Sequence, residues 1–528
     1  MKIKQVICFL CSVVMLLSML ACQSADAPSE DGVQPSTPSG DVSQTGEAEV
    51  DPFAEKYVFN WMLATQNANP FVETKMHQLM TEKLNISFEI IEYTPNQHIE
   101  QVNLKLASRQ IPDLITFIDA PVANQYGPEG AFLEISKYLD RIPNLKEKLE
   151  ANKDDKYRAY DLDNLLWFTP TVYSEPTPIF DYSYNKEAFA SVGVTDLSTW
   201  DKVYEGLKLI KQKNPQFYPY ATEAFGFFGF NLLISSFTEG RCDYRMYGFN
   251  AETDEFVFMP ADPGFIDAVN FFAKMYTEGL VDPEYSSLDG GGMVRKVRNG
   301  EVVMLCEFMG GWTGYATYMS DTNYVLSPLQ IPTAPGKKPT LGPQPAKLGV
   351  RGTAVSAELE QNPGKLDRAL RLLDWLYSEE AFNAYWHHPD VCEMVDGQPV
   401  YIDAVYNVED PDFYRIGDIY FPWSMMSFQD KPDNRSDPAS EYTAYVKEVL
   451  KGKPELYSKN PAVPFDPDLQ ARVNQLTAAI EDRFNAGIYE FFEGKRPMSE
   501  YDAFASGLLS AGGEELIRIY NEQYAKYK

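Results

Sequence analysis

YVFNWML, at residues 57–63, is an apolar run with the length and composition of a buried β-strand. A helical stripe of apolar residues follows within 71–84, and ISFEIIEY, at 86–93, has the alternation of a second strand. Another helix is predicted over 98–109, and PDLITFI, at 112–118, is typical of a short buried strand. This order of strand, helix, strand, helix and strand predicts an α/β layer with parallel pairing.

The amino-terminal region has the features of an export signal. A short basic start precedes an apolar run at 6–20, which is too short to span a bilayer comfortably and has no basic flank after it. Met19 to Cys22 is similar to the lipobox of bacterial lipoproteins, in which residues 1–21 are removed and the cysteine is lipidated on sulfur. An ordinary cleaved signal, with an incidental Cys22, is the alternative. We expect an acylated Cys22 to anchor the chain on the extracellular face of the cell membrane.

Composition limits the possible partners. The chain has 46 basic and 76 acidic side chains and a net charge of −30, which repels nucleic acid and anionic lipid headgroups. Residues 22–50 are rich in Ser, Pro, Gly and acidic residues, so they are expected to form a flexible linker. The remainder is long enough for two lobes.

The cysteines and the sequence motifs give little indication of a catalytic site or a metal site. Cys242, Cys306 and Cys392 are isolated and predicted to be buried free thiols, with one disulfide and one leftover thiol as the alternative. The sequence contains no H-E-x-x-H, G-x-S-x-G or phosphate-binding glycine loop. The adjacent His387 and His388 are expected to be solvated. We therefore predict no catalytic residue, no metal site and no cofactor.

Tryptophans near loops and strand ends are the main candidates for binding. Flat aromatic faces stack on sugar rings, and amide, carboxylate and guanidinium groups bind hydroxyls. Packing in the core is the alternative for every tryptophan, and it is the one expected for Trp200 and Trp375, which lie on amphipathic stretches. The predicted stacking residues are Trp61, Trp167, Trp312, Trp386 and Trp423, and the predicted hydrogen-bonding residues are Asn67, Asp119 and Arg351.

Several segments, taken in order, resemble a known family. DYSYNKEAFASVGV (181–194) followed by TWDKVYEGLKLIK (199–211) resembles the family 1 extracellular solute-binding proteins of bacterial importers. Similar pieces are IPDLI (111–115), NGEVVMLCEFMGGW (299–312) and GTAVSAELEQNPGKLDRALRLLDWLYSEE (352–380). The likeness is strongest to the lipidated, carbohydrate-type subgroup of Gram-positive bacteria.

The resemblance implies a two-lobed α/β fold of the class II periplasmic-binding-protein type, with mixed sheets flanked by helices and a ligand cleft at the hinge. It implies a monomer that captures an oligosaccharide and delivers it to a transmembrane permease of an ATP-binding-cassette importer. Segments 51–180 and 290–345 are expected in lobe 1, and segments 181–289 and 346–528 in lobe 2.

Two departures and three rival functions accompany this resemblance. Relatives often carry a calcium loop where this chain has KQKNPQFYPYATE (211–223), so no calcium is predicted there. Relatives also tend to carry a Gly-x-Glu-Gly turn where this chain has AYWHHPDV (384–391), so the ligand's identity does not carry over by analogy. The rivals are a surface carbohydrate-active enzyme, a binder without transport, and a binder of a peptide or another non-sugar solute.

Overall fold

The computed structural model describes most of the chain after the predicted linker. The described residues are 53–64, 70–173, 178, 180–222, 230–242, 245–308, 326–389, 392–395, 398–401, 427–428 and 441–528. They all belong to one compact unit that spans Pro52–Lys528.

The first sheet contains the three strands predicted from the start of the sequence. Its strand order is β15-β4-β12-β3-β1-β2. β1 pairs in parallel with β2 and β3, whereas β12 runs antiparallel to β3 and β4, so the sheet is mixed. Its strands are β1 (Tyr57–Ala64), β2 (Ile86–Tyr93), β3 (Leu114–Asp119), β4 (Thr169–Tyr173), β12 (Leu348–Val355) and β15 (Ser427–Phe428).

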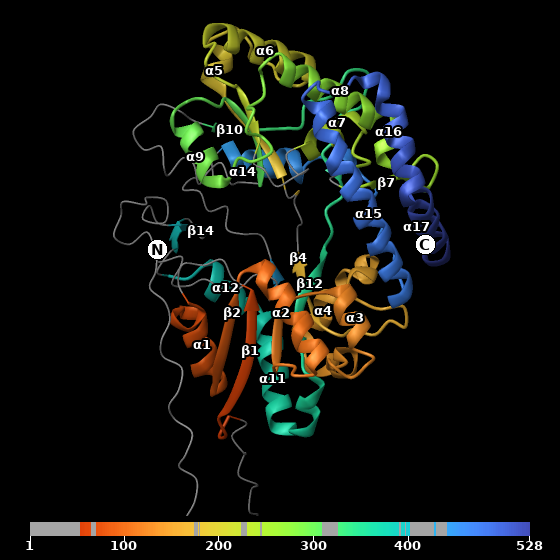
Figure 1. Ribbon diagram of the computed structural model, residues 1–528. Coiled ribbons are helices and arrows are strands. Elements are labelled where there is room, and N and C mark those ends of the chain that lie inside the picture. The colour runs from red at the N-terminus through yellow and green to blue at the C-terminus, as the bar shows by residue number, and fades with distance from the viewer. Residues whose placement is uncertain are drawn as a thin grey trace, which may run out of the picture. The chain divides into compact units, whose positions relative to one another are not determined.

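Helices pack on this sheet (Figure 1). Buried apolar side chains of the sheet and helices form the first core. The stripe predicted within 71–84 is confirmed as α1, and the helix predicted over 98–109 begins three residues earlier, at a proline in the first turn. The helices are α1 (Lys75–Leu84), α2 (Pro95–Ser108), α3 (Ala120–Tyr126), α4 (Pro143–Ala151), α11 (Pro363–Leu376) and α12 (Glu379–Trp386).

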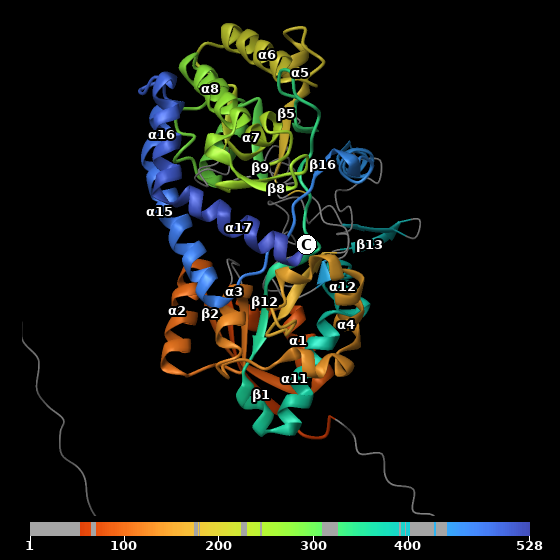
Figure 2. The ribbon, with the colours of Figure 1, turned by 90° about the vertical axis from the view of Figure 1, so that its right-hand side faces the viewer.

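The second sheet has the strand order β10-β5-β9-β6 and its own core, which is rich in aromatic rings. Its strands are β5 (Phe180–Asn185), β6 (Tyr220–Thr222), β9 (Met304–Phe308) and β10 (Leu326–Leu329). The remaining helices are α5 (Lys186–Ala190), α6 (Trp200–Lys213), α7 (Asn231–Phe237), α8 (Pro263–Thr277), α9 (Gly290–Arg298), α14 (Glu441–Tyr445), α15 (Pro467–Phe492), α16 (Tyr501–Leu508) and α17 (Glu514–Tyr527). Figure 2 shows β5 and β9 of this sheet beside α7 and α8.

Three pairs of short strands complete the fold. They are β7 (Tyr247–Asn250) with β8 (Glu255–Phe258), β11 (Gly342–Pro343) with β16 (Tyr457–Ser458), and β13 (Cys392–Val395) with β14 (Gln398–Tyr401). The prediction of mixed sheets flanked by helices is therefore confirmed. In the described part of the chain, no helix combines the length and the apolar character that a membrane span requires.

The predicted division of the chain between lobes needs a correction. Segment 290–345 was expected with the first sheet, but its strands β9 and β10 pair with β5 of the second sheet. Segment 346–528 was expected with the second sheet, but β12 inserts between β3 and β4 and α11 packs in the first core. The assignment came from the family resemblance, and short similar segments do not tell which strands of this chain pair with one another.

Three cysteines and two tryptophans are buried, as the sequence predicts. Cys242, Cys306 and Cys392 are buried thiols that form no disulfide with one another. Trp200 and Trp375 lie in the second and first cores respectively. The free-thiol and core predictions for these five residues are confirmed.

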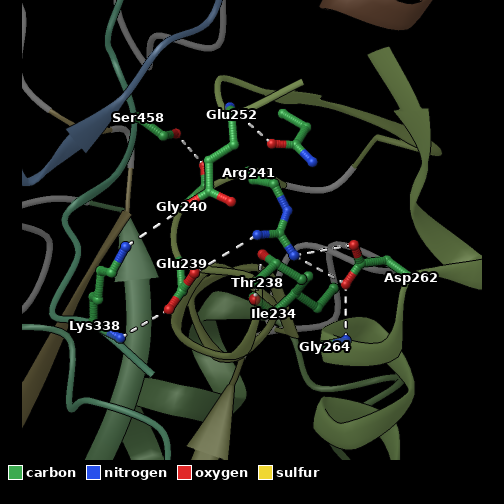
Figure 3. A network of polar contacts seen from close by, with 11 residues as sticks. Ile234, Thr238, Glu239, Gly240, Arg241, Glu252, Asp262, Gly264, Lys338 and Ser458 are labelled. Atoms are coloured by element: carbon green, nitrogen blue, oxygen red, sulfur yellow. Dashed lines mark hydrogen bonds and ion pairs between the residues drawn. The ribbon is translucent and has the colours of Figure 1, made fainter. Parts of the chain in front are cut away.

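One connection between the two sheets consists of residues 330–347, and a hydrogen bond holds it to the turn after α7 (Figure 3). The backbone N–H of Lys338 donates to Glu239 Oε1 at 3.0 Å. Beside it, the hydroxyl of Ser458 donates to the carbonyl of Gly240. Gly240 has φ +82°, and a Cβ there would lie 2.4 Å from Thr340 Oγ1, so the turn requires glycine.

The far end of the same connection is hydrogen-bonded to Asp155, which precedes β4 of the first sheet. On the side of the second core, the N–H of Gln344 donates to the carbonyl of Ser458 at 2.8 Å. On the other side, the N–H of Lys347 donates to Asp155 Oδ2 at 2.6 Å. Within the part of the chain that the structure describes, the residues between them, Pro345 and Ala346, have no hydrogen-bond partner. Between these two hydrogen bonds, two residues therefore have no partner in the described part of the chain.

Gly352 lets β12 approach β4 closely, and this gives a testable prediction. A Cβ at Gly352 would lie 2.0 Å from the carbonyl oxygen of Thr169, a backbone atom that cannot turn aside. We expect Gly352→Ala to lower the free energy of unfolding by about 2 kcal/mol through overpacking. Gly507, in α16, has open space around it, and Gly507→Ala should be neutral or stabilising by about 0.5 kcal/mol. Urea unfolding of both variants checks this, and equal midpoints would contradict it.

Candidate functional site

The end of β3 carries a β-bulge. Thr353 of β12 lies opposite Thr116, but the next residue, Gly352, lies opposite Ile118, so Phe117 is an extra residue in β3. Phe117 has φ +65°, which is rare for a bulky side chain. Bulges of this kind are common next to functional sites, where they redirect side chains.

Beyond the bulge, two of the predicted residues meet. Asp119 lies opposite Arg351 in the strand register, and Arg351 Nε lies 2.5 Å from Asp119 Oδ1. The guanidinium also lies over the ring of Phe117, 4.3 Å from its centroid. The side chains of Arg351 and Asp119 are 43% and 31% exposed. A planar donor is therefore held between a carboxylate and an aromatic ring while part of it stays open to solvent.

Three further residues at this site were not identified from the sequence. Phe117 was part of a predicted strand, and Tyr173, at the end of β4, is partly exposed. Burial raises the pKa of Tyr173, while Arg158 and Arg351 act in the opposite direction. His98, on α2, is fully buried, and its ring meets that of Phe117 edge-on at 6.3 Å. An aromatic residue two positions before a strand-terminal aspartate was the available signal for Phe117.

Burial of His98 predicts a dependence of stability on pH. Burial lowers its pKa to about 4, against smaller opposite effects from backbone groups of Leu63 and Thr116 and from Asp119. In the unfolded chain a histidine titrates near 6.5, so between about pH 6.5 and 4 the unfolded state binds the proton first. The free energy of unfolding should therefore fall by about 2 kcal/mol from pH 7 to pH 5 because of this residue.

Urea unfolding at several pH values checks this prediction. The His98→Gln variant should lack this part of the slope between pH 7 and pH 5. His77 is a suitable comparison, because burial lowers its pKa as well but the side chain is only half-buried. His77→Gln should therefore change the slope less, and an unchanged slope in His98→Gln would contradict the prediction.

Two predicted stacking residues lie in the core, and we correct the prediction for them. Trp61 is 1% exposed and donates its indole N–H to Thr116 Oγ1 at 2.8 Å. Trp167 is 7% exposed and donates to Asp161 Oδ2 at 2.8 Å. Its ring occupies the space beside Gly127, where a Cβ would lie 2.2 Å from it. Both indoles are enclosed by protein and present no free face to a ligand.

The other predicted residues are not placed by the structure. Cys22, Asn67, Trp312 and Trp423 lie outside the described residues. Trp386 is the last residue of α12, but its side chain is not described. The roles predicted for these five residues stay predictions.

Away from the ion pair of Arg351 and Asp119, a surface hollow of about 430 Å³ lies beside the second sheet. It is lined by the end of β5, by α5 and α6 and by the segment before β9, including Asn185, Lys213 and Val303. None of the predicted ligand residues lines it. Among the described residues, no three His, Cys, Asp or Glu side chains are grouped closely enough to hold a metal ion.

The match to a known protein family includes the strands that carry the site. Residues 81–381, more than half of the chain, match the family described as bacterial extracellular solute-binding protein. This range includes β3, β4 and β12, which carry the site. No curated protein sequence matches the chain.

Solved structures of similar fold cover nearly the whole chain. The alginate-binding protein AlgQ2 without calcium ion is 16% identical, with a TM-score of 0.73 over 90% of this chain and 99% of that one. A human-milk-oligosaccharide-binding solute-binding protein from Bifidobacterium longum infantis is 18% identical, with a TM-score of 0.71 over 89% and 99% of the two chains. FusA of S. pneumoniae, in complex with kestose, is 14% identical, with a TM-score of 0.73 over 90% and 99%. At these identities the likeness shows the fold.

Proposed function

The chain belongs to the bacterial extracellular solute-binding protein family, and from this premise we propose that it captures an oligosaccharide outside the cell and delivers it to an ATP-binding-cassette importer. The observation that carries the proposal is the half-exposed pair of Arg351 and Asp119, held at the end of β3 within the family match. Three proteins of similar fold are an alginate-binding protein, a protein that binds milk oligosaccharides and a protein in complex with kestose.

The chemistry of the pair suits hydroxyl groups. A guanidinium has five N–H donors in a plane, and the Asp119 contact at Nε leaves donors at the exposed edge. Asp119 has a second carboxylate oxygen that accepts hydrogen bonds. Adjacent hydroxyls of a sugar ring donate and accept at similar spacing, so the pair binds them without a net charge.

Capture of the ligand is proposed to use closure of the two lobes over it. A ligand that contacts both lobes binds the closed form better than the open form, so binding shifts the population toward closure. Asn67, Trp312, Trp386 and Trp423 are the further candidates for ligand contacts. The protein acts as a monomer, and a permease in the membrane receives the closed form.

Acylated Cys22 is proposed to hold the protein at the extracellular face of the membrane. The linker at 22–50 then separates the folded unit from the lipid. The protein itself is proposed to bind without chemical turnover, as a member of a family of binding proteins.

A thermal-shift screen of residues 51–528 tests the proposal. The panel contains kestose, Man5GlcNAc, a milk tetrasaccharide, an alginate tetrasaccharide and a set of peptides. A ligand at one hundred times its Kd adds about 2.7 kcal/mol to the free energy of unfolding, which gives a clear shift. A saccharide that binds and is recovered unchanged supports the proposal. A saccharide that is consumed would favour an enzyme, and binding of peptides alone would exclude the oligosaccharide.

A further inference from the structure

Phe117 has a strained backbone in a place where strain is unusual. The other non-glycine residues with positive φ in the described part of the chain lie at helix ends and turns, whereas Phe117 lies inside a strand. A bulky residue with φ +65° costs free energy and persists only where its surroundings impose it. Such a residue next to a candidate site calls for a functional explanation.

The bulge decides which side chains meet. Without an extra residue, the register that pairs Thr353 with Thr116 would continue unbroken along both strands. Arg351 would then lie opposite Ile118, and Asp119 would lie opposite the next residue of β12, Val350. The bulge at Phe117 instead sets Asp119 opposite Arg351, and their side chains form the 2.5 Å contact. The ion pair is therefore a product of the extra residue.

The ring of Phe117 also holds the guanidinium. Arg351 lies 4.3 Å from the ring centroid, which is within the range of a favourable cation–π contact. The buried ring of His98 meets the same phenyl ring at 82° and supports it from the protein interior. Support from His98, Phe117 and Asp119 leaves the guanidinium few orientations, which lowers the entropy lost when a ligand binds.

We propose that Phe117 is a positioning residue for ligand recognition: its bulge sets Asp119 opposite Arg351, and its ring fixes the guanidinium plane that the ligand meets. This inference rests on the proposed function, in which Arg351 and Asp119 bind the saccharide. Phe117 acts through Arg351 and does not itself contact the ligand.

A double-mutant cycle tests the inference. The probe is whichever panel saccharide binds the wild type most tightly, and its Kd is measured by calorimetry for wild type, Phe117→Ala, Arg351→Ala and the double variant. We expect Phe117→Ala to raise the Kd about tenfold. The double variant should bind no more weakly than Arg351→Ala alone, because the ring has no effect once the guanidinium is gone.

Two further variants serve as controls. Phe117→Tyr keeps an aromatic face under the guanidinium and should retain a Kd within about twofold of the wild type. In the second core the guanidinium of Arg496 lies 5.6 Å from the Phe504 ring centroid, so Phe504→Ala removes a similar partly buried ring away from β3. It should leave the Kd unchanged. If Phe117→Ala does not fold, Phe117→Leu takes its place in the cycle.

The possible outcomes separate the two proposals. Losses that add in the double variant would mean that Phe117 contacts the ligand directly, and this overturns the inference while the proposed function stands. The same holds if Arg351→Ala weakens binding and Phe117→Ala does not. A wild-type protein that binds none of the saccharides overturns the proposed function, and the inference with it.

Discussion

Arg351→Ala is expected to weaken saccharide binding about 100-fold, the largest effect of any single substitution at the site. The side chain is 43% exposed, and its guanidinium is fixed by Asp119 and by the ring of Phe117, so little entropy is lost when it binds. Hydrogen bonds that involve a charged group contribute about 1.5–3 kcal/mol each, and removal of two modest ones accounts for the change. Calorimetry with the tightest saccharide of the panel gives the Kd.

The surface pair of Arg141 and Asp367 provides a matched control. Arg141 Nη2 lies 2.6 Å from Asp367 Oδ1, and the side chains are 44% and 34% exposed, close to the values for Arg351 and Asp119. Arg141→Ala removes the same charge from a similar environment in the first lobe. It should leave the Kd unchanged, and a similar loss in both variants would show that net charge, rather than a specific site, attracts the ligand.

Arg368→Ala is expected to lower the free energy of unfolding by about 4 kcal/mol, the largest effect on stability. The side chain is 1% exposed, and Nη1 donates to the carbonyl of Leu84 and, at 3.2 Å, to that of Asn85. Nη2 donates to the carbonyl of Glu55 at 3.3 Å, and the guanidinium lies 4.7 Å from the ring centroid of Phe53. Removal of the side chain leaves these carbonyls without a donor and opens a cavity.

Arg371, one helical turn further on, is the control for this prediction. Its guanidinium lies 5.5 Å from the ring centroid of Phe53, but its side chain is 44% exposed and pairs with Asp367 at 2.7 Å. Exposed ion pairs contribute little, so Arg371→Ala should cost about 1 kcal/mol or less. Urea unfolding followed by circular dichroism measures both variants, and equal losses would mean that burial of Arg368 adds nothing.

The local parts of the fold were predictable from the sequence, and the long-range pairing was not. The runs at 57–63, 86–93 and 112–118 became β1, β2 and β3 because alternation and apolar content are properties of neighbouring residues. The insertion of β12 between β3 and β4 joins residues that are far apart in the chain. Neither periodicity within 346–528 nor the family resemblance reveals this pairing, and the division into lobes that the resemblance implied was wrong for 290–345 and for β12.

The same difference applies to the site. Asp119 and Arg351 were predicted as separate residues, and the structure brings them together. Their contact depends on one extra residue, Phe117, whose effect on register appears only when both strands are paired. Trp61 and Trp167 were predicted from the residue type and its place near a strand end, but position in sequence does not tell which face of the strand is covered.

Pro345 and Ala346, which have no hydrogen-bond partner among the described residues, limit how the connection between Gln344 and Lys347 can bend. The ring of Pro345 fixes its φ near −65°, so in this connection a bend depends mainly on ψ of Pro345 and on the two dihedral angles of Ala346. A movement that uses so few torsions has few directions available to it. The direction of the chain between Gln344 and Lys347 is therefore set by three backbone dihedral angles.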